Sequence, residues 1–405
     1  MKIAAIISEY NPFHNGHAYQ IRSTKETLGV DFVVAIMSGN YVQRGEPAIF
    51  DKWTRTRLAL LGGVDVVIEL PTLYSTASAE LFAKGAVDLL NQLNIIDYLS
   101  FGSEHGDINP LTTLAQLYLN ESPHFQHHLK ANLKKGFSFP KARSLATSTL
   151  YPEYETLLKG SNNILAIEYL KALLQSDSSI APFTLKRVGS SYLETKLQST
   201  YASATAIRLA LKDNPNAVDA TIPLPCFDYL LDALGHSVFS IYPEDYFPYY
   251  RYLLTINNPS VENIYDFPVE LNNRLQKIML QSENYAHFID AAQSKNYTKT
   301  TIQRALLHQF LNITTTNIQE NNTQLHHYIK ILGFKKSASP VLALLKNNAR
   351  LPLITNVADH QKQLLADGKK MLHDEVKYTN LYNELLLQKS NHIKKNDYSQ
   401  PIIIL

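Results

Sequence analysis

The fold of this chain is decided by one stretch, Ile6-Ile7-Ser8-Glu9-Tyr10-Asn11-Pro12-Phe13-His14-Asn15-Gly16-His17. It ends a short Ile-rich apolar run and leads directly into a helical pattern over His17–Leu28. Open α/β sheets bind ligands at the carboxyl ends of their strands. A helix that begins there offers free backbone N–H groups and a positive dipole end to phosphate. The stretch therefore predicts a phosphate-binding site at the end of a first buried strand.

Three residues of this stretch suit that chemistry. Gly16 lacks the Cβ that would keep a nucleotide away from the backbone, and His14 and His17 can donate hydrogen bonds to phosphate oxygens as charge builds up. Neither a Gly-x-Gly-x-x-Gly fingerprint nor a Walker P-loop is present. On spacing alone, two histidines three residues apart are equally compatible with a structural helix start.

The apolar pattern predicts an α/β fold in the first half. Near-continuous apolar runs are typical of strands that are buried on both faces of a parallel sheet. We expect strands at Lys2–Ile7, Phe32–Met37, Val64–Leu70 and Tyr98–Gly102, and a weaker one at Thr184–Val188. Helical patterns separate them at His17–Leu28, after Asp51 up to Gly62-Gly63, and at Ala77–Leu93. This alternation predicts a doubly wound parallel sheet, Rossmann-like, over residues 1–212.

Strand signals fade in the second half. We expect residues 213–405 to form a mostly α-helical domain, which begins after the polar run Lys212-Asp213-Asn214-Pro215-Asn216. The predicted helices are Val269–Glu283, Thr300–Asn312, His326–Leu332 and Val357–Leu387, the last interrupted near Gly368.

Composition sets the broad class of protein. The single cysteine excludes a disulfide framework and Cys-ligated zinc or iron–sulfur sites. No apolar run approaches the roughly 20 residues that span a bilayer, and the apolar N-terminal run is too short for a signal peptide. A net charge of +2 neither requires nor excludes a nucleic-acid partner. We expect a soluble cytoplasmic protein, a monomer, without a metal held by its own side chains.

A second motif, Tyr201-Ala202-Ser203-Ala204-Thr205-Ala206-Ile207-Arg208, occurs late in the predicted α/β half. The pair His-x-Gly-His and this Ser/Thr-rich helix start with its arginine resemble the two signatures of the nucleotidyltransferase superfamily. In that interpretation Ser203 caps the helix, while Thr205 and Arg208 face the β- and γ-phosphates of ATP. The alternative is an ordinary Ser-capped helix with an arginine on its surface.

Longer motifs narrow the resemblance and span nearly the whole chain, although the last sixty or so residues match only loosely. They are Ser8–His17, Met37–Ala48, Phe101–Glu104, Gly160–Leu165, Arg187–Gly189, Ser203–Arg208, Tyr297–His308 and Ile331–Phe334. Together they are similar to the bacterial tRNA(Met) cytidine acetate ligase family. The tract that this family usually shows as Ser-Ser-Ala-Thr is Ala202-Ser203-Ala204-Thr205 here, which removes one hydroxyl and keeps the Thr and the Arg.

The resemblance implies a ligase that makes acetyl-adenylate from acetate and ATP and then acetylates N4 of the wobble cytidine in elongator tRNA(Met). It implies His14, His17 and Arg208 as catalytic residues, and Mg²⁺ accompanying ATP without an assigned protein ligand. The implied ATP contacts are Ile7, Ser8, Glu9, Tyr10, Asn11, Pro12, Phe13, His14, Asn15, Gly16, His17, Ala18, Tyr19, Gln20, Gly102, Asn162, Arg187, Val188, Ser203 and Thr205.

RNA needs positive charge, because phosphate contacts supply affinity without sequence information. Lys299 and Arg304 fall along one predicted helix, and Lys335-Lys336 follow it along the chain, so we predict RNA contacts at these four residues. A solvated basic helix face explains any single cluster equally well. Two other functions remain open: an adenylyltransferase of the same superfamily that acts on a small metabolite, and a non-catalytic RNA-binding protein.

Overall fold

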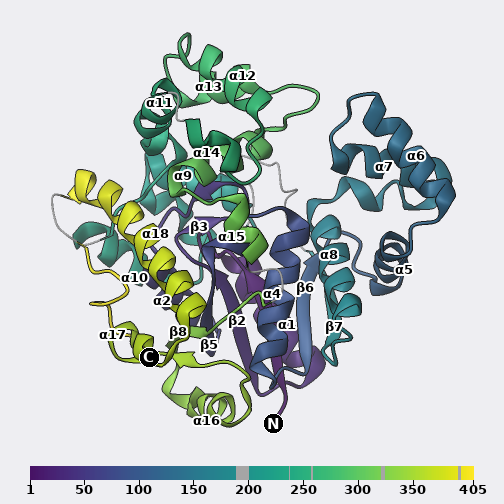
Figure 1. The fold of residues 1–405 in the computed structure, drawn as a ribbon. Helices are drawn as coiled ribbons and strands as arrows, with labels where there is room; N and C mark the ends of the chain where they lie inside the picture. The colour runs from purple at the N-terminus through teal and green to yellow at the C-terminus, as the bar shows by residue number, and fades with distance from the viewer. Residues whose placement is uncertain (188–199, 237, 257–258, 321–323, 391–393) are drawn as a thin grey trace.

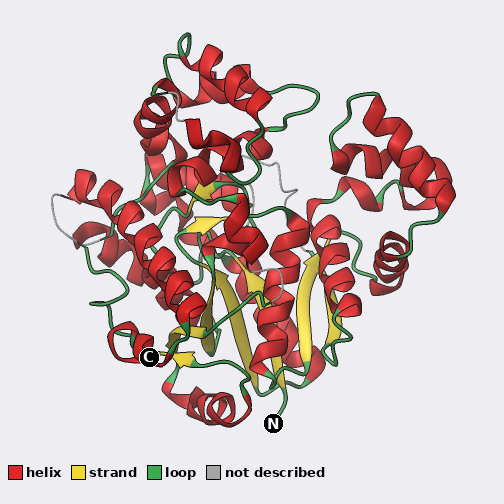
Figure 2. Ribbon diagram, in the orientation of Figure 1, coloured by secondary structure: helices red, strands yellow, loops and turns green. Residues whose placement is uncertain are grey.

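The computed structural model describes residues 1–187, 200–236, 238–256, 259–320, 324–390 and 394–405. One sheet forms its central layer, with helices on both faces (Figure 2). Five parallel strands make up the middle of this sheet, in the order β5-β2-β1-β6-β7. They are β1 (Ile3–Ser8), β2 (Phe32–Ser38), β5 (Val66–Leu70), β6 (Tyr98–Ser103) and β7 (Ala181–Lys186).

The first four expected strands are therefore confirmed. The fifth is confirmed over residues 184–186, since β7 begins earlier, at Ala181, and Val188 lies outside the described residues. The doubly wound order places a switch point between β1 and β6. From β1 the chain proceeds outward through β2 and β5, and then returns to β6 on the other side of β1. The connections that leave the carboxyl ends of β1 and β6 diverge, which opens a crevice there. A hairpin of β3 (Tyr41–Val42) and β4 (Glu46–Pro47) lies apart from the sheet.

The helices of the first half cover both faces of the sheet (Figure 1). Along β2, Val34 and Ile36 face the core under α4 and α8, whereas Val33 and Ala35 face the core under α1 and α2. This alternation is the two-residue period of a strand. The helices are α1 (Asn15–Leu28), α2 (Lys52–Leu61), α3 (Thr72–Ser75), α4 (Ala79–Leu93), α5 (Ile108–Leu119), α6 (Pro123–Lys134), α7 (Phe139–Leu150), α8 (Ser161–Gln175) and α9 (Ala204–Asp213).

The helical expectation for the second half holds for much of its length. Its helices are α10 (Leu224–His236), α11 (Phe247–Thr255), α12 (Val269–Met279), α13 (Tyr285–Ala292), α14 (Lys299–Leu311), α15 (Thr315–Glu320), α16 (Ser339–Asn348), α17 (Val357–His360) and α18 (Ala366–Ser390). The interruption expected near Gly368 falls instead at residues 361–365, and Gly368 lies inside α18.

One predicted helix is wrong, because the segment His326–Leu332 leads into a strand, β8 (Ile329–Phe334). β8 pairs antiparallel with β5, and β9 (Leu353–Ile354) and β10 (Ile403–Ile404) pair with β8. A short apolar run does not distinguish a buried strand from a buried helix by its period. The free edge of β5 decides the matter, so the second half is not purely helical and helps to complete the sheet.

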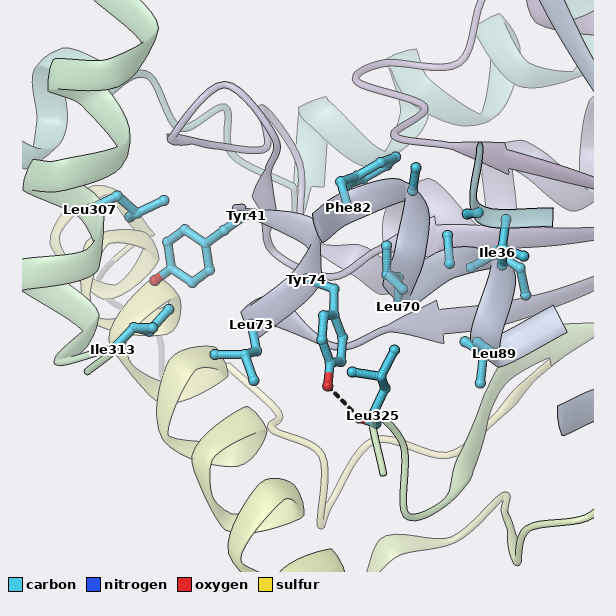
Figure 3. Packing of buried hydrophobic residues seen from close by; sticks show 14 of the residues in the cluster. Ile36, Tyr41, Leu70, Leu73, Tyr74, Phe82, Leu89, Leu307, Ile313 and Leu325 are labelled. Atoms are coloured by element: carbon cyan, nitrogen blue, oxygen red, sulfur yellow. Dashed lines mark hydrogen bonds between the residues drawn. The ribbon is translucent and has the colours of Figure 1, made fainter. Parts of the chain in front are cut away.

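The two halves also share a core. Figure 3 shows Tyr41 and Leu73 from the first half beside Leu307 and Ile313 from the second. The hydroxyl of Tyr74 donates a hydrogen bond to the backbone carbonyl of Leu325. Apolar surface of both halves is thus removed from water in one continuous cluster.

Four charged side chains are buried where the C-terminal segment meets the sheet. Lys52 Nζ lies 2.7 Å from Glu69 Oε1 and 2.7 Å from Asp397 Oδ1, and Lys330 pairs with both carboxylates. Two positive and two negative charges balance, which is how buried ions are tolerated. None of the described helices is both long and apolar enough to cross a membrane.

Candidate active site

A pocket opens at the carboxyl ends of β1 and β6, where the switch point of the sheet predicts a ligand. It has a volume of about 240 Å³. Its wall combines the loop after β1, the start of α1, the end of β6, the start of α8 and the start of α9. The residues that line it are Ile7, Ser8, Glu9, Tyr10, Asn11, His14, His17, Gln20, Val42, Gln43, Arg44, Glu46, Ala79, Phe82, Phe101, Gly102, Ser161, Asn162, Leu165, Tyr169, Arg187, Ser203, Ala204 and Arg208.

The two motif histidines cap helix α1 and line the pocket. His14 is the N-cap residue, and its Nδ1 accepts a hydrogen bond from the Gly16 backbone N–H at 3.1 Å. The Nδ1 of His17 accepts one from the His14 backbone N–H at 3.2 Å, and the two rings stack with their centroids 3.8 Å apart. A backbone N–H only donates, so both Nδ1 atoms carry lone pairs. In each neutral ring the proton is therefore on Nε2, which is then a hydrogen-bond donor.

Burial keeps both rings neutral. It lowers the pKa of His14 to about 3, and the nearby charges of Arg187 and Arg208 act in the same direction. Burial also lowers the pKa of His17 well below its ordinary value, again reinforced by His14 and Arg187. At neutral pH the pair supplies two N–H donors without adding two positive charges.

Gly16 is required by the imidazole beside it. A Cβ at position 16 would lie 2.9 Å from Cε1 and 3.1 Å from Nδ1 of His14. The sequence suggested that Gly16 makes room for a nucleotide, and the structure shows that it makes room for the ring of His14. The glycine therefore supports the site by letting a catalytic candidate occupy its capping position.

The buried Arg55 holds the loop after β1 through hydrogen bonds to backbone carbonyls. Arg55 donates hydrogen bonds to the backbone carbonyls of Glu9 at 2.6 Å and of Ser38 at 3.1 Å, and also to that of Gly39. Burial lowers its pKa to about 10, so it stays charged at neutral pH. Tyr10 adopts a φ of 45°, a left-handed conformation that is uncommon outside glycine. These bonds fix the ends of β1 and β2 in the shape that the pocket needs.

Glu9 places a carboxylate in the pocket. Its Oε1 accepts a hydrogen bond from the Gln43 backbone N–H at 3.0 Å. Burial raises its pKa, which the hydrogen bond from Gln43 and the charges of Arg44 and Arg208 oppose, whereas Glu46 raises it further. A buried carboxylate with a raised proton affinity thus lies beside two guanidinium groups.

The second motif delivers Arg208 to the same pocket. Ser203 caps α9 by accepting a hydrogen bond from the Ala206 backbone N–H at 3.1 Å. Arg208 Nη1 donates to the carbonyl of Asn11 at 2.8 Å, and its Nη2 donates to Thr205 Oγ1 at 3.2 Å. Thr205 does not line the pocket, so it holds the arginine in position. The two motifs are joined in space by the bond between Arg208 and Asn11.

Behind the pocket wall formed by the start of α8, Glu104 caps that helix. Its carboxylate accepts hydrogen bonds from the backbone N–H groups of Asn162 at 3.1 Å and Asn163 at 2.7 Å, and from Asn162 Nδ2 at 2.7 Å. This negative charge sits at a helix N-terminus, where the dipole favours it. Glu104 itself does not line the pocket, and it acts by fixing Asn162. Arg187 packs against Gly102, since its Cγ lies 3.2 Å from the position that a Cβ on Gly102 would occupy.

The structure brings most of the predicted ATP contacts together, but not all. Thirteen of the residues named for ATP or catalysis line the pocket: Ile7, Ser8, Glu9, Tyr10, Asn11, His14, His17, Gln20, Gly102, Asn162, Arg187, Ser203 and Arg208. Val188 is outside the described residues. The others do not line the pocket: Pro12, Phe13, Asn15, Gly16, Ala18, Tyr19 and Thr205. Asn15, for example, bonds to the backbone carbonyls of Thr200 and Ala220 instead.

The four predicted RNA contacts are dispersed. Lys299 begins α14 and is exposed, whereas Arg304 on the same helix pairs with Asp266 at 3.1 Å. Lys335 and Lys336 follow β8, which is antiparallel to β5, so they lie at the edge of the sheet opposite the pocket. The structure therefore does not bring these two lysines together with the site.

Sequence reasoning assigned no role to one wall of the pocket. Gln43, Arg44 and Glu46 come from the β3–β4 hairpin, and Glu46 accepts a hydrogen bond from Gln303 of α14 at 2.6 Å. An apolar wall is made by Ala79, Phe82, Phe101, Leu165 and Tyr169. The polar residues after the second predicted strand were the available signal, because that strand also ends at the pocket edge of the sheet.

Comparison with known proteins identifies the family of the chain. A sequence model described as HIGH Nucleotidyl Transferase matches residues 1–398, and the fold and site define the protein as a member of that class. The tRNA(Met) cytidine acetate ligases of Caldanaerobacter subterraneus subsp. tengcongensis and Thermoanaerobacter pseudethanolicus are 41% and 40% identical to it, each over the full length of both chains. The chain belongs to the tRNA(Met) cytidine acetate ligase family.

Solved structures lead to the same family. The apo structure of Thermotoga maritima TmcAL superposes with a TM-score of 0.95, at 32% identity over the full length of both chains. The same protein bound with alpha-thio ATP superposes with a TM-score of 0.92, again at 32% identity. The expected α/β fold and the resemblance stated from the sequence are both confirmed.

Proposed function

We propose that this protein is an ATP-dependent tRNA(Met) cytidine acetate ligase. It converts acetate and ATP to acetyl-adenylate and pyrophosphate, and then acetylates N4 of the wobble cytidine of elongator tRNA(Met), releasing AMP. The observation that carries this proposal is the pocket itself, in which the donors of both nucleotidyltransferase motifs, His14, His17 and Arg208, lie at the switch point of the sheet. Membership of the ligase family identifies acetate as the source of the acyl group and a cytidine of tRNA(Met) as the acceptor.

The first step needs alignment and charge stabilisation more than a base. Acetate is already ionised at neutral pH, since its pKa is comparable to that of glutamate, about 4.3. One of its oxygens attacks the α-phosphorus, and the bond to the bridging oxygen of pyrophosphate breaks. The Nε2–H groups of His14 and His17 and the guanidinium of Arg208 donate to the phosphates as negative charge moves toward the leaving group.

Mg²⁺ is expected to enter with ATP, because it is usually held by phosphates together with one or two carboxylates. The described pocket fits this, since Glu9 and Glu46 line it. The ion would neutralise charge on the leaving pyrophosphate.

The second step explains why acetate must be activated. The exocyclic amine of cytosine is a weak nucleophile because its lone pair is delocalised into the ring. Its attack on the acetyl carbon breaks the acyl–phosphate bond, and AMP leaves while the nitrogen loses a proton. The target base must leave its stack to reach the pocket, which costs less in a single-stranded anticodon loop than in a duplex. We assign RNA contacts to the mostly helical residues 213–405. Among them is Lys299, which begins α14, the helix whose Gln303 bonds to Glu46 of the pocket.

The test is ATP–pyrophosphate exchange with acetate, run with and without unmodified elongator tRNA(Met). The tRNA is then digested and analysed by mass spectrometry. We expect acetate-dependent exchange and an acetyl group on one cytidine, without acetyl-CoA. Exchange with another carboxylate or phosphorylated metabolite and no acetylated RNA would support the small-metabolite alternative. Tight tRNA binding without exchange would support the non-catalytic one. The expected location is the cytoplasm, and the expected oligomeric state is a monomer.

A further inference from the structure

The chain contains a long basic stretch that the site does not use. From residue 122 to residue 152 there is no acidic side chain, and the stretch lies between Glu121 and Glu153. It folds into α6 and α7, which turn at Gly136, where φ is 77°. Its cations are Lys130, Lys134, Lys135, Lys141 and Arg143.

The parallel sheet does not require this hairpin. A crossover between parallel strands needs one helix of a dozen or more residues. α8 fulfils that role between β6 and β7, because it packs along α4 and its end leads into β7. α6 and α7 pack mainly on each other and stand out from the body beside α8 (Figure 1). An addition that the fold does not need is free to serve as a surface for a partner.

The positive charge of the hairpin is presented to solvent. Among the residues that the structure describes, only its arginine pairs with an acidic side chain: Arg143 Nη2 lies 2.6 Å from Glu168 Oε1 on α8. Four lysines are exposed, and no ion pair joins them to an acidic side chain in the part of the chain that the structure describes. They are Lys130, Lys134, Lys135 and Lys141.

A fifth lysine connects the hairpin to the second half of the chain. The Nζ of Lys295 donates a hydrogen bond to the carbonyl of Lys135 at 3.1 Å and lies 4.1 Å from the ring centroid of Phe137. Lys295 precedes α14, which begins at Lys299 and touches the pocket wall through its bond from Gln303. On its other side the hairpin is tied to α8, which also lines the pocket. The exposed lysines are thus held between two elements that border the site.

We propose that this basic hairpin surface, made of Lys130, Lys134, Lys135, Lys141 and Lys295, binds the phosphate backbone of the tRNA whose nucleotide enters the pocket. The inference rests on the proposed function and adds an RNA-holding surface that lies mostly in the first half of the chain. Exposed lysines without acidic partners are the usual footprint of phosphate binding. They orient an RNA on the protein and read no bases, so this surface sets affinity and position.

The test compares two matched pairs of substitutions. Lys134→Gln with Lys135→Gln neutralises the hairpin. Lys2→Gln with Lys346→Gln neutralises two exposed lysines near the opposite edge of the sheet. Each pair includes one lysine from the last turn of a helix, so the effects on helix stability are alike. Binding of elongator tRNA(Met) and of an unrelated tRNA is measured over a series of salt concentrations, beside acetate-dependent pyrophosphate exchange without RNA.

For the hairpin pair we expect the Kd of both tRNAs to rise about tenfold. The slope of the logarithm of the binding constant against the logarithm of the salt concentration should be smaller by about 2, one unit for each lost phosphate contact. Exchange without RNA stays at the wild-type rate, which shows that the pair folds and activates acetate. The control pair behaves as wild type in all three measurements.

Two results would overturn the inference while leaving the ligase intact. One is a hairpin variant with wild-type Kd and salt slope, and the other is an equal loss in the control pair. A wild-type protein that neither binds nor acetylates tRNA is a different outcome, because it removes the proposed function together with this surface.

Discussion

His17→Asn separates the structural work of one histidine from its proposed chemical work. In the structure Nδ1 of His17 accepts the His14 backbone N–H at 3.2 Å, while the tautomer leaves a proton on Nε2. The Oδ1 of an asparagine is attached to Cγ as Nδ1 is, so Asn retains the capping acceptor. It has no atom that reaches the position of Nε2. His17→Ala is the comparison, because it loses both functions.

The magnitudes follow from these contacts. Loss of one preorganised donor to developing charge costs about 10²–10³ in kcat, or roughly 2.7–4 kcal/mol of transition-state stabilisation. Loss of a capping hydrogen bond costs about 1 kcal/mol of folding stability. Both variants lose the ring contacts of His17 with Tyr10 and Phe13, whose centroids lie 4.9 Å and 5.5 Å away. We therefore expect equal losses of rate, and an unfolding free energy about 1 kcal/mol lower for Ala than for Asn.

Acetate-dependent pyrophosphate exchange reports the rate, and urea denaturation reports the stability. If His17→Asn exchanges within about threefold of wild type, a gap of less than 1 kcal/mol in barrier, the imidazole does not act on the phosphates. Burial lowers the pKa of His14 to about 3 and that of His17 well below its ordinary value, so neither ring gains a proton between about pH 6 and 8. A limb near pH 6.5 in the wild-type rate that disappears in His17→Asn would contradict the neutral tautomer.

Three further predictions rest on separate contacts. The unfolding free energy measured by urea titration should fall as pH drops below about 6.5, by up to about 1.4 kcal/mol per pH unit for each buried neutral histidine, because the unfolded chain then binds protons that the folded chain cannot. The buried histidines with lowered pKa are His14, His17, His308 and His326, and a flat profile would contradict this. Gly16→Ala should lower the exchange rate about 100-fold, since its Cβ would displace the His14 imidazole by its 2.9 Å approach; a normal rate would show that the ring position does not matter. Asp397→Ala should cost about 3–5 kcal/mol in urea denaturation, because Lys52 and Lys330 would remain buried with Glu69 alone; a loss below about 1 kcal/mol would show that water enters to solvate them.

Much of the fold could be predicted because its signals are local. The strands of the first half are apolar runs that end in polar or glycine-containing turns, and the helix after Asp51 begins and ends where its caps indicated. β8 could not be predicted in this way, since the run Ile329–Phe334 suits either a strand or a helix. Its conformation follows from the unpaired edge of β5, which lies more than 250 residues earlier in the chain.

The residues of the site also divide into those that local motifs predict and those that only the tertiary structure brings to the pocket. His14, His17 and Arg208 were predicted because each occurs in a short motif at a helix start. Arg44 and Glu46 were missed, although they follow the second predicted strand, because no short motif at a helix start contains them. They reach it only because β2 ends at the same edge of the sheet as β1.

The sequence by itself determined the parallel α/β fold, the position of the pocket after the first strand and the family. These depend on periodicity and on contiguous motifs, which can be recognised in the sequence without any knowledge of long-range contacts. Only the tertiary structure decided the tautomers of the two histidines, the role of Gly16 as space for an imidazole, and the bond from Arg208 to Asn11. It also decided that Lys335 and Lys336 lie away from the site. The physical reason is that hydrogen-bond geometry and burial are set by segments remote in sequence, and they in turn fix protonation and the direction in which each side chain points.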